Sequence, residues 1–197
     1  MKPKGRYNIG VARRYGVSVV EDISPQGVED FLNICAETFV RKNLDKLDVD
    51  YFHELISTLS ASECGSIFFA DYQGTRLATA LVVYFGRTAT YYYGGSRAIH
   101  RNVMAAYLLQ FEIMRKAKAL GYQYYDLFGI TPQNEPINGW TDISAFKRKF
   151  GGQEIRLVPT LEYIYDPIAY QEWRDIERDR QRERRRRRVE AIKSSVE

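Results

Sequence analysis

Two adjacent residues, Phe146 and Lys147, combine an aromatic ring with a cation, and both side chains can act on a polar substrate. A cation held in a fixed position stabilises negative charge that grows on oxygen in the transition state of acyl transfer. A neighbouring aromatic ring can stack on a nucleobase. A structural interpretation competes with this one: in an amphipathic helix, Phe146 would lie in the core and Lys147 in solvent. On the residues alone, the structural interpretation is the stronger.

A run of three tyrosines offers a second candidate surface. Tyr91 and Tyr93 are two residues apart, so in a strand they share one face, and Tyr92 points into the core. The pair could bind a polar ligand or serve as core packing alone. Ser96 and Arg97 follow at the expected start of a long helix, where a phosphate could bind. Capping of that helix by Ser96 explains the residue equally well.

The charge of the chain is distributed unevenly. Its 197 residues carry a net charge of +4, and much of the excess lies in Arg184–Arg188. Such a run suggests a partner with phosphates, either nucleic acid or anionic lipid, although solvated helix ends are often basic too. Cys35 and Cys64 form no CxxC pair and have no histidine near them in sequence. We therefore expect neither a metal site nor a disulfide framework.

Nothing in the sequence predicts export or a membrane span. Met1–Arg14 lacks the apolar core of a signal peptide. The longest apolar stretch, Ala78–Phe85, is far too short to cross a bilayer. We therefore expect a cytoplasmic protein, to which the arginine run would add at most peripheral contact with an anionic membrane at its inner face.

These residues need elements that position them, and hydrophobic periodicity and turn residues predict such a series. We expect, in chain order, a strand at 17–20, a helix opened by Ser24-Pro25, a helix at 50–59, strands at 66–72, 75–85 and 88–93, a long helix at 102–120, a strand at 124–128, a short helix at 142–150, and late strands at 154–158 and 161–165. The long helix is expected to bury the face that carries Val103, Tyr107, Phe111 and Met114.

This order predicts an α/β fold with helices packed on a mixed, mostly antiparallel sheet. It resembles the GNAT fold of acyl-CoA N-acyltransferases, an analogy that carries no function by itself. Enzymes of that fold that use acetyl-CoA bind its pyrophosphate with an R/Q-x-x-G-x-G/A loop. Residues 94–101 lack that spacing, which disfavours a coenzyme A site. We expect residues 1–15 to be a basic lead-in or linker, 16–166 the domain, and 167–197 a charged helix or disordered tail.

Several motifs follow one another along the chain in a specific order. They are Tyr91–Ser96, Ala117–Gly121, Tyr125–Ile130 and Phe146–Gly152, with Asn8–Val17 and Thr38-x-x-Arg41 as further elements. The series resembles the signature of the Fem family of peptidoglycan interpeptide-bridge aminoacyltransferases, and it covers most of residues 7–165. The resemblance is to the second GNAT-like domain of that family.

The resemblance implies a donor, an acceptor and roles for particular residues. The donor would be aminoacyl-tRNA and the acceptor the amine of a lipid II-type peptidoglycan precursor, with no metal or organic cofactor because the ester is already activated. Lys147 would face the reacting ester, and Phe146 would meet the end of the tRNA. The remaining candidates would contact the precursor's diphosphate or peptide; they are Arg41, Tyr91, Tyr93, Ser96 and Arg97.

Three points stay open at the level of sequence. Asp126 could be a general base, but a structural role in holding the following loop is favoured. The family pattern implies two such domains, so we expect the first domain to be absent or on another polypeptide. Two alternatives to a tRNA-dependent transferase remain, namely an N-acyltransferase that uses acyl-CoA and a non-catalytic module that binds tRNA or the precursor.

Overall fold

The computed structural model describes the backbone of residues 1–42, 44, 47–132 and 140–194, and the side chains of all of these except 181 and 184–194. The chain divides into two compact units, residues 1–153 and residues 154–197. Each unit is described by itself. These boundaries differ from the expected division at residues 16 and 166, because the expected lead-in joins the first unit and the late strands do not form.

The segment expected to be a lead-in is a helix. Helix α1 (Pro3–Arg14) has Pro3 in its first turn, where the missing N–H costs no hydrogen bond. Its buried positions include Ile9 and Ala12, which belong to the same core cluster as the buried residues of helix α4 (Ala105–Ala119). The basic residues occupy its exposed side. Because they outnumber the few apolar residues, the helical spacing of the apolar face was not recognised in the sequence. The expectation of a linker over residues 1–15 was therefore wrong.

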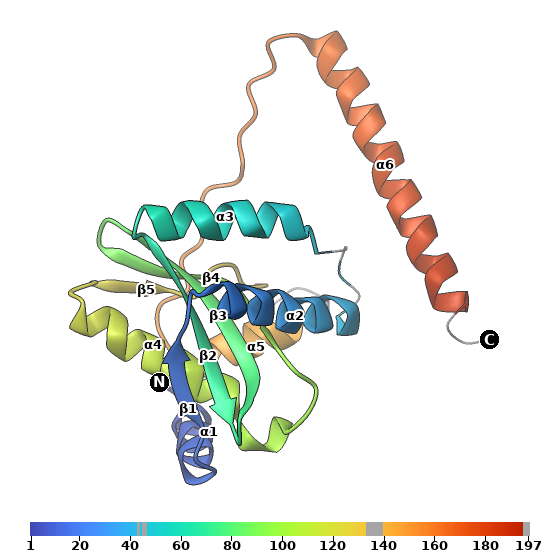
Figure 1. The fold of residues 1–197 in the computed structure, drawn as a ribbon. Coiled ribbons are helices and arrows are strands. Elements are labelled where there is room, and N and C mark those ends of the chain that lie inside the picture. The colour runs from blue at the N-terminus through green and yellow to red at the C-terminus, as the bar shows by residue number, and fades with distance from the viewer. Residues whose placement is uncertain (43, 45–46, 133–139, 195–197) are drawn as a thin grey trace. The chain divides into compact units, whose positions relative to one another are not determined.

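A five-stranded sheet forms the centre of the first unit (Figure 1). Its strands lie in the order of the sequence: β1 (Ser18–Glu21), β2 (Gly65–Tyr72), β3 (Thr75–Phe85), β4 (Thr88–Ser96) and β5 (Tyr124–Asp126). The first four strands are antiparallel and β5 is parallel to β4. Turns at Gln73-Gly74 and at Gly86 connect the strands of the meander, and these residues have the positive φ angles that such turns require.

Helices cover both faces of this sheet (Figure 1). Helices α2 (Pro25–Arg41) and α3 (Val49–Ala61) pack on one face, over Ile67, Phe69 and Leu81. Helix α4 (Ala105–Ala119) packs with α1 on the other face, over alternating residues of the same strands. The period-two alternation of strand residues thus supplies two cores from one sheet. The expected α/β class with a mixed, mostly antiparallel sheet is confirmed.

The long helix differs from expectation at its start and in its buried face. A 3₁₀ turn, Arg101–Val103, precedes α4, and Met104 between them adopts a left-handed backbone. The helix buries mainly Leu108, Leu109, Ile113 and Ala117, rather than the face that was expected. Tyr107 and Phe111 lie partly exposed beside that face, so the prediction was wrong by about one residue of helical rotation.

The second unit contains a coil and one helix. Residues 154–165 are coil rather than the expected strands, and their apolar side chains are exposed. Helix α6 (Pro167–Ser194) follows, with the Asp166 carboxylate accepting hydrogen bonds from the N–H groups of Ile168 and Ala169. This settles the tail as helical in the described residues. No helix among the described residues has both the length and the hydropathy that a membrane span requires.

Candidate active site

Lys147 is buried. It lies on helix α5 (Thr141–Arg148), and only 5% of the residue is exposed. Its Nζ donates a hydrogen bond of 2.8 Å to the carbonyl oxygen of Gly129, and lies 5.8 Å from the ring centroid of Tyr91. The competing interpretation, which placed this lysine in solvent, was wrong. The cation lies where β5 has ended and β4 continues alone.

Helix α5 holds the segment that follows β5 by three side chains. Besides the Lys147 bond, the N–H of Thr131 donates to the Ser144 hydroxyl at 2.9 Å, and Arg148 donates to the carbonyl of Thr131 at 2.5 Å. Ser144 is fully buried, which makes its bond a fixed attachment. The short helix therefore fixes the backbone around Gly129, and this backbone in turn fixes the lysine.

Two opposing effects act on the charge of Lys147. Burial lowers the pKa of its ammonium, because a cation loses its hydration there. The carboxylate of Asp126 raises the same pKa by electrostatic attraction. Asp126 also accepts a hydrogen bond of 2.7 Å from the N–H of Phe128, so the expected role in holding the following loop is confirmed.

The ring of Phe146 is engaged within the protein. It packs edge-on against Tyr107 at a centroid distance of 4.9 Å and against Phe150 at 5.2 Å. Tyr107 and Phe150 also stack on each other. Phe146 thus anchors α5 to α4 through an aromatic cluster. Phe146 precedes Lys147 in the sequence, but its ring packs against two aromatic residues of the protein.

A β-bulge separates the tyrosines that were expected to act together. In the β3–β4 ladder Leu81 pairs with Tyr93 and Val82 pairs with Tyr91, so Tyr92 is an extra residue. Tyr91 packs in the core under α4, whereas Tyr92 and Tyr93 pack under α2 and α3. The prediction that Tyr91 and Tyr93 share one face was therefore wrong, because the bulge reverses the alternation.

The two faces of the bulge give the tyrosines different surroundings. Burial raises the pKa of Tyr91, which lies beside Lys147. On the opposite face, burial raises the pKa of Tyr51, and the neighbouring hydroxyl of Tyr51 raises the pKa of Tyr92. Tyr93 also packs edge-on against Phe52, with 4.7 Å between ring centroids. The aromatic run thus contributes to both sides of the sheet.

The other three candidates meet at the end of β4. Ser96 is the last residue of that strand and does not start a helix, so the expected helix cap is wrong. Its hydroxyl accepts a hydrogen bond of 3.3 Å from Arg41 at the end of α2. Arg97 forms an ion pair with Glu37 and donates to the carbonyl of Arg76 at 3.0 Å. Arg41, Ser96 and Arg97 therefore form one cluster.

Thr38 and Gly95 bring α2 and β4 into contact at this cluster. The Thr38 hydroxyl accepts a 2.9 Å hydrogen bond from the N–H of Ser96. A side chain at Gly95 would place its Cβ 2.8 Å from that hydroxyl and 2.9 Å from the carbonyl oxygen of Ile34. Glycine is required for so close an approach. The sequence pattern named Thr38 and the glycines, but it did not reveal this contact.

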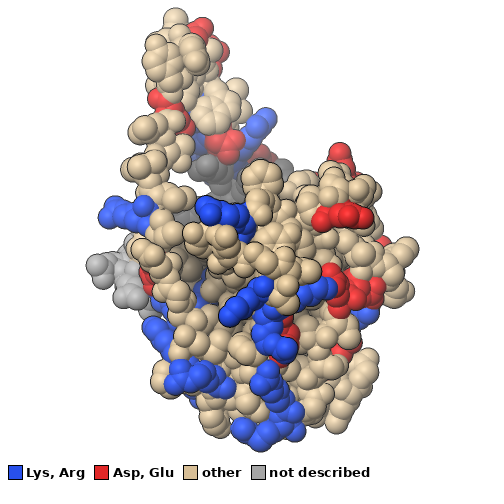
Figure 2. Space-filling model, turned by 90° about the vertical axis from the view of Figure 1, so that its left-hand side faces the viewer, with Lys and Arg blue, Asp and Glu red and all other residues tan. Residues whose placement is uncertain are grey.

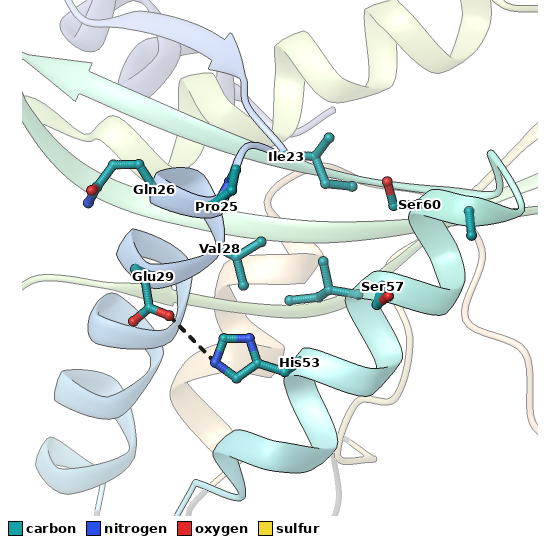
Figure 3. A pocket seen from close by; sticks show the side chains of 10 residues that line it. Ile23, Pro25, Gln26, Val28, Glu29, His53, Ser57 and Ser60 are labelled. Carbon is teal, nitrogen blue, oxygen red and sulfur yellow. Dashed lines mark ion pairs between the residues drawn. The ribbon is translucent and has the colours of Figure 1, made fainter.

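A cavity lies elsewhere, between α2 and α3 (Figure 3). It has a volume of about 620 Å³, and its lining includes Glu29 and His53, which are 3.5 Å apart. Apart from Gln26, the rest of the wall consists of apolar residues and serines. None of the predicted site residues lines this cavity. Its position does not connect it with Lys147.

Basic residues are spread over the surface of the first unit. Figure 2 shows several separate groups of Lys and Arg on one face, with Asp and Glu gathered toward one side. The exposed residues of α1 contribute to this charge; they are Lys2, Lys4, Arg6, Arg13 and Arg14. The side chains of Arg184–Arg188, which were expected to contact phosphates, lie outside the described residues.

Comparisons with known proteins agree with the sequence motifs. The model of the FemAB family matches residues 60–178, more than half of the chain. A lipid II:glycine glycyltransferase from Staphylococcus epidermidis is 26% identical over 131 residues, which cover 66% of this chain and 31% of the relative. A UDP-N-acetylmuramoylpentapeptide-lysine N(6)-alanyltransferase from Weissella viridescens is 26% identical over 162 residues, covering 81% of this chain and 46% of the relative. The chain thus spans less than half the length of these relatives.

Solved structures show the same fold. The crystal structure of FemX superposes with a TM-score of 0.70 at 16% identity, covering 76% of this chain and 54% of that one. A predicted acetyltransferase from Clostridium acetobutylicum, solved with acetyl-CoA, gives a TM-score of 0.59 at 12% identity, with coverage of 74% and 96%. The expected likeness to acetyltransferases of the GNAT fold is confirmed.

Proposed function

This chain belongs to the FemAB family, and from that premise we propose that it contributes to transfer of an amino acid from aminoacyl-tRNA to a peptidoglycan precursor. The acceptor would be the amine of a lipid II-type muropeptide, in the formation of an interpeptide bridge. The names of the matched glycyl- and alanyltransferases support this substrate class. Because those relatives are longer, a first domain on the same or another polypeptide belongs to the proposal.

The observation that carries the proposal is the buried ammonium of Lys147. It is held by the Gly129 carbonyl at the point where β4 and β5 part. In the proposed reaction the acceptor nitrogen attacks the ester carbonyl carbon, and negative charge develops on the carbonyl oxygen. A new amide bond forms, the ester C–O bond breaks, and the terminal ribose hydroxyl leaves with the proton that the amine loses. A preorganised cation stabilises the charged transition state more than the neutral ester.

The cluster of Arg41, Ser96 and Arg97 supplies the second part of the proposal. An arginine can bind a diphosphate through two parallel hydrogen bonds, and Arg41 is exposed and makes a long bond of 3.3 Å to Ser96. We assign this cluster to the precursor's diphosphate. Because Tyr91 and Tyr93 lie on opposite faces of the sheet, we assign them different roles. Tyr91 forms part of the surroundings of Lys147, and Tyr93 belongs to the aromatic residues that pack under α3.

Substitution of Lys147 by methionine tests the proposal, because methionine keeps the length of the side chain and removes its charge. We expect the rate of transfer from aminoacyl-tRNA to fall by about a hundredfold to a thousandfold. Precursor affinity should change far less, because the ground-state carbonyl carries little charge. The reaction must contain any partner domain that turnover requires. Lys149→Met is the matched control, and it should transfer at the parental rate.

Two results would contradict the proposal. Transfer by Lys147→Met at the parental rate would remove the oxyanion role and favour a binding module. Micromolar binding of acetyl-CoA with no affinity for charged tRNA, measured by calorimetry, would favour an acyl-CoA-dependent enzyme instead.

A further inference from the structure

Phe128 combines two unusual properties. Its backbone is left-handed, with φ of +63°, which is a strained conformation for a bulky side chain. Its side chain is also a large apolar group with 52% of the residue exposed. Strained residues persist where the surrounding structure holds them, and they cluster at functional sites. The hydrogen bond from the N–H of Phe128 to Asp126 holds this one.

The ring of Phe128 extends an aromatic surface. It packs edge-on against Tyr92, with 5.7 Å between centroids. Edge-on ring contacts continue from Tyr92 through Tyr93 and Phe52 to Tyr51, of which 42% is exposed. We call these three residues, Tyr51, Tyr92 and Phe128, the aromatic ledge. They come from α3, from the bulge in β4 and from the segment after β5, so the fold brings them together from distant parts of the sequence.

The chemistry of the aromatic ledge favours stacking. All three residues present an aromatic ring, and Tyr51 and Tyr92 each add a single hydroxyl. Phe128 has no polar group. Ring surface is therefore the main feature that the ledge presents to a ligand. A flat π-system such as a nucleobase gains from such a surface, whereas a sugar would need hydrogen bonds to its hydroxyls.

The aromatic ledge also adjoins the candidate reacting group. Gly129, whose carbonyl holds the Lys147 ammonium, is the next residue after Phe128. The ring of Phe146, by contrast, is packed between Tyr107 and Phe150. Phe128, which lies on the segment that holds Lys147 and has an exposed ring, is therefore a better candidate for stacking on a ligand than Phe146. In an aminoacyl ester of a terminal adenosine, one ribose carries both the ester and the base, so the two lie close together.

We propose that the aromatic ledge binds a nucleobase by stacking, with Phe128 as its outer ring. The inference rests on the proposed function for its assignment to the adenine at the end of the donor tRNA. A nucleotide-linked acceptor would present a uracil with the same flat chemistry, and the experiment below separates the two sources.

The test is an NMR titration of the full chain at low salt with the trinucleotide CCA and, separately, with UMP. The ring is removed by Phe128→Gly, because glycine adopts the left-handed backbone without strain and the loop keeps its shape. We expect the dissociation constant for CCA to rise by about fivefold to a hundredfold, as for loss of one stacked base. Phe128→Trp, which restores a ring, should bind CCA at least as well as the parent.

Phe85 provides the matched control, because it is another exposed phenylalanine and lies at the end of β3. Phe85→Ala should bind CCA like the parent. A loss of affinity for UMP but not for CCA would support the base site and move it to the acceptor. The proposal is overturned if the parent binds neither probe, or if Phe128→Gly binds both as the parent does. These binding measurements need no turnover. The base site can therefore be disproved while transfer still depends on Lys147, and the role of Lys147 can be disproved while the base site still binds CCA.

Discussion

At the scale of single residues, the notable feature is a buried lysine on whose charge two effects act in opposite directions. Burial works against its ammonium, and one carbonyl and one carboxylate work in its favour. Asp126 is the carboxylate, and it is exposed, so its effect reaches Lys147 partly through solvent. Such a balance makes the protonation of Lys147 sensitive to its neighbour.

We predict that Asp126→Asn lowers the pKa of Lys147 further. The amide keeps an oxygen that can accept the hydrogen bond from Phe128, so the loop is preserved while the negative charge is lost. The cation would then lose its proton at a lower pH than in the parent. As pH rises, any activity that needs the ammonium should therefore begin to fall at a lower pH than in the parent. The pKa can be measured by NMR titration of the Lys147 Cε signal, assigned by its absence in Lys147→Met.

Asp142→Asn serves as the control for this titration. Asp142 lies on α5 with Lys147, but its carboxylate pairs with Lys42 at 2.6 Å. Its loss should leave the Lys147 titration in place. A Lys147 pKa that is unchanged in Asp126→Asn would show that Asp126 acts on the loop alone.

At the scale of elements, the contact between α2 and β4 has almost no spare room. Gly95→Ala would drive a methyl group into the Ile34 carbonyl and the Thr38 hydroxyl, both on α2. We predict a loss of about 1–3 kcal/mol in the free energy of unfolding, as for other overpacked sites. The Arg41–Ser96 bond should weaken with it, because the two elements must separate.

Chemical denaturation of Gly95→Ala and Gly10→Ala provides the comparison. Gly10 lies within α1, and a Cβ there would meet nothing closer than 3.5 Å. Alanine favours a helix interior, so Gly10→Ala should gain about 0.5–1 kcal/mol. Equal effects of the two substitutions would contradict the tight α2–β4 packing.

Local sequence signals predicted most of these elements well. The start of α2, the α3 helix and the strands β2 and β3 were predicted to within two residues, because periodicity, Ser24-Pro25 and the glycine turns are local features, whereas β4 continues three residues beyond its predicted end. The bulge at Tyr92 was not predictable, since it depends on the register with β3. Residues 154–165 alternate like a strand, but alternation does not supply a neighbouring strand to pair with.

The candidate site was predicted less completely than the fold. Lys147 and the cluster of Arg41, Ser96 and Arg97 were named from their motifs, yet burial of the lysine could not be inferred from an amphipathic pattern. Phe128 was missed altogether. Its signal is a left-handed backbone and an exposed ring, and both are properties of tertiary structure.

At the scale of the whole molecule, the buried core among the residues whose side chains are described lies in one of the two units. The two core clusters of buried residues draw all their members from the first unit. In the second unit, the described apolar residues of the coil are largely exposed. The stability of the fold therefore resides in residues 1–153, and the basic helix α6 is available for an electrostatic role.

We predict that removal of residues 167–197 weakens RNA binding mainly at low salt. Each arginine that neutralises a phosphate steepens the fall of affinity with salt concentration, so the truncated chain should have a flatter slope. The melting temperature should stay close to that of the parent, because neither core is touched. Fluorescence anisotropy with tRNA across a salt series measures the slope. An identical slope in both chains would make α6 a solvated helix without a phosphate partner.

The bulge in β4 also acts as a frameshift in the alternation of the strand. Residues before it and residues after it follow opposite parities, so one inserted residue decides which core each tyrosine serves. The strand residues that face α4 and those that face α2 and α3 therefore no longer follow one continuous alternation, and each set can vary independently. A substitution at Tyr93 can then alter the surface under α3 while Tyr91 and its neighbouring lysine keep their surroundings, which lets one side of the molecule diversify at little cost to the other.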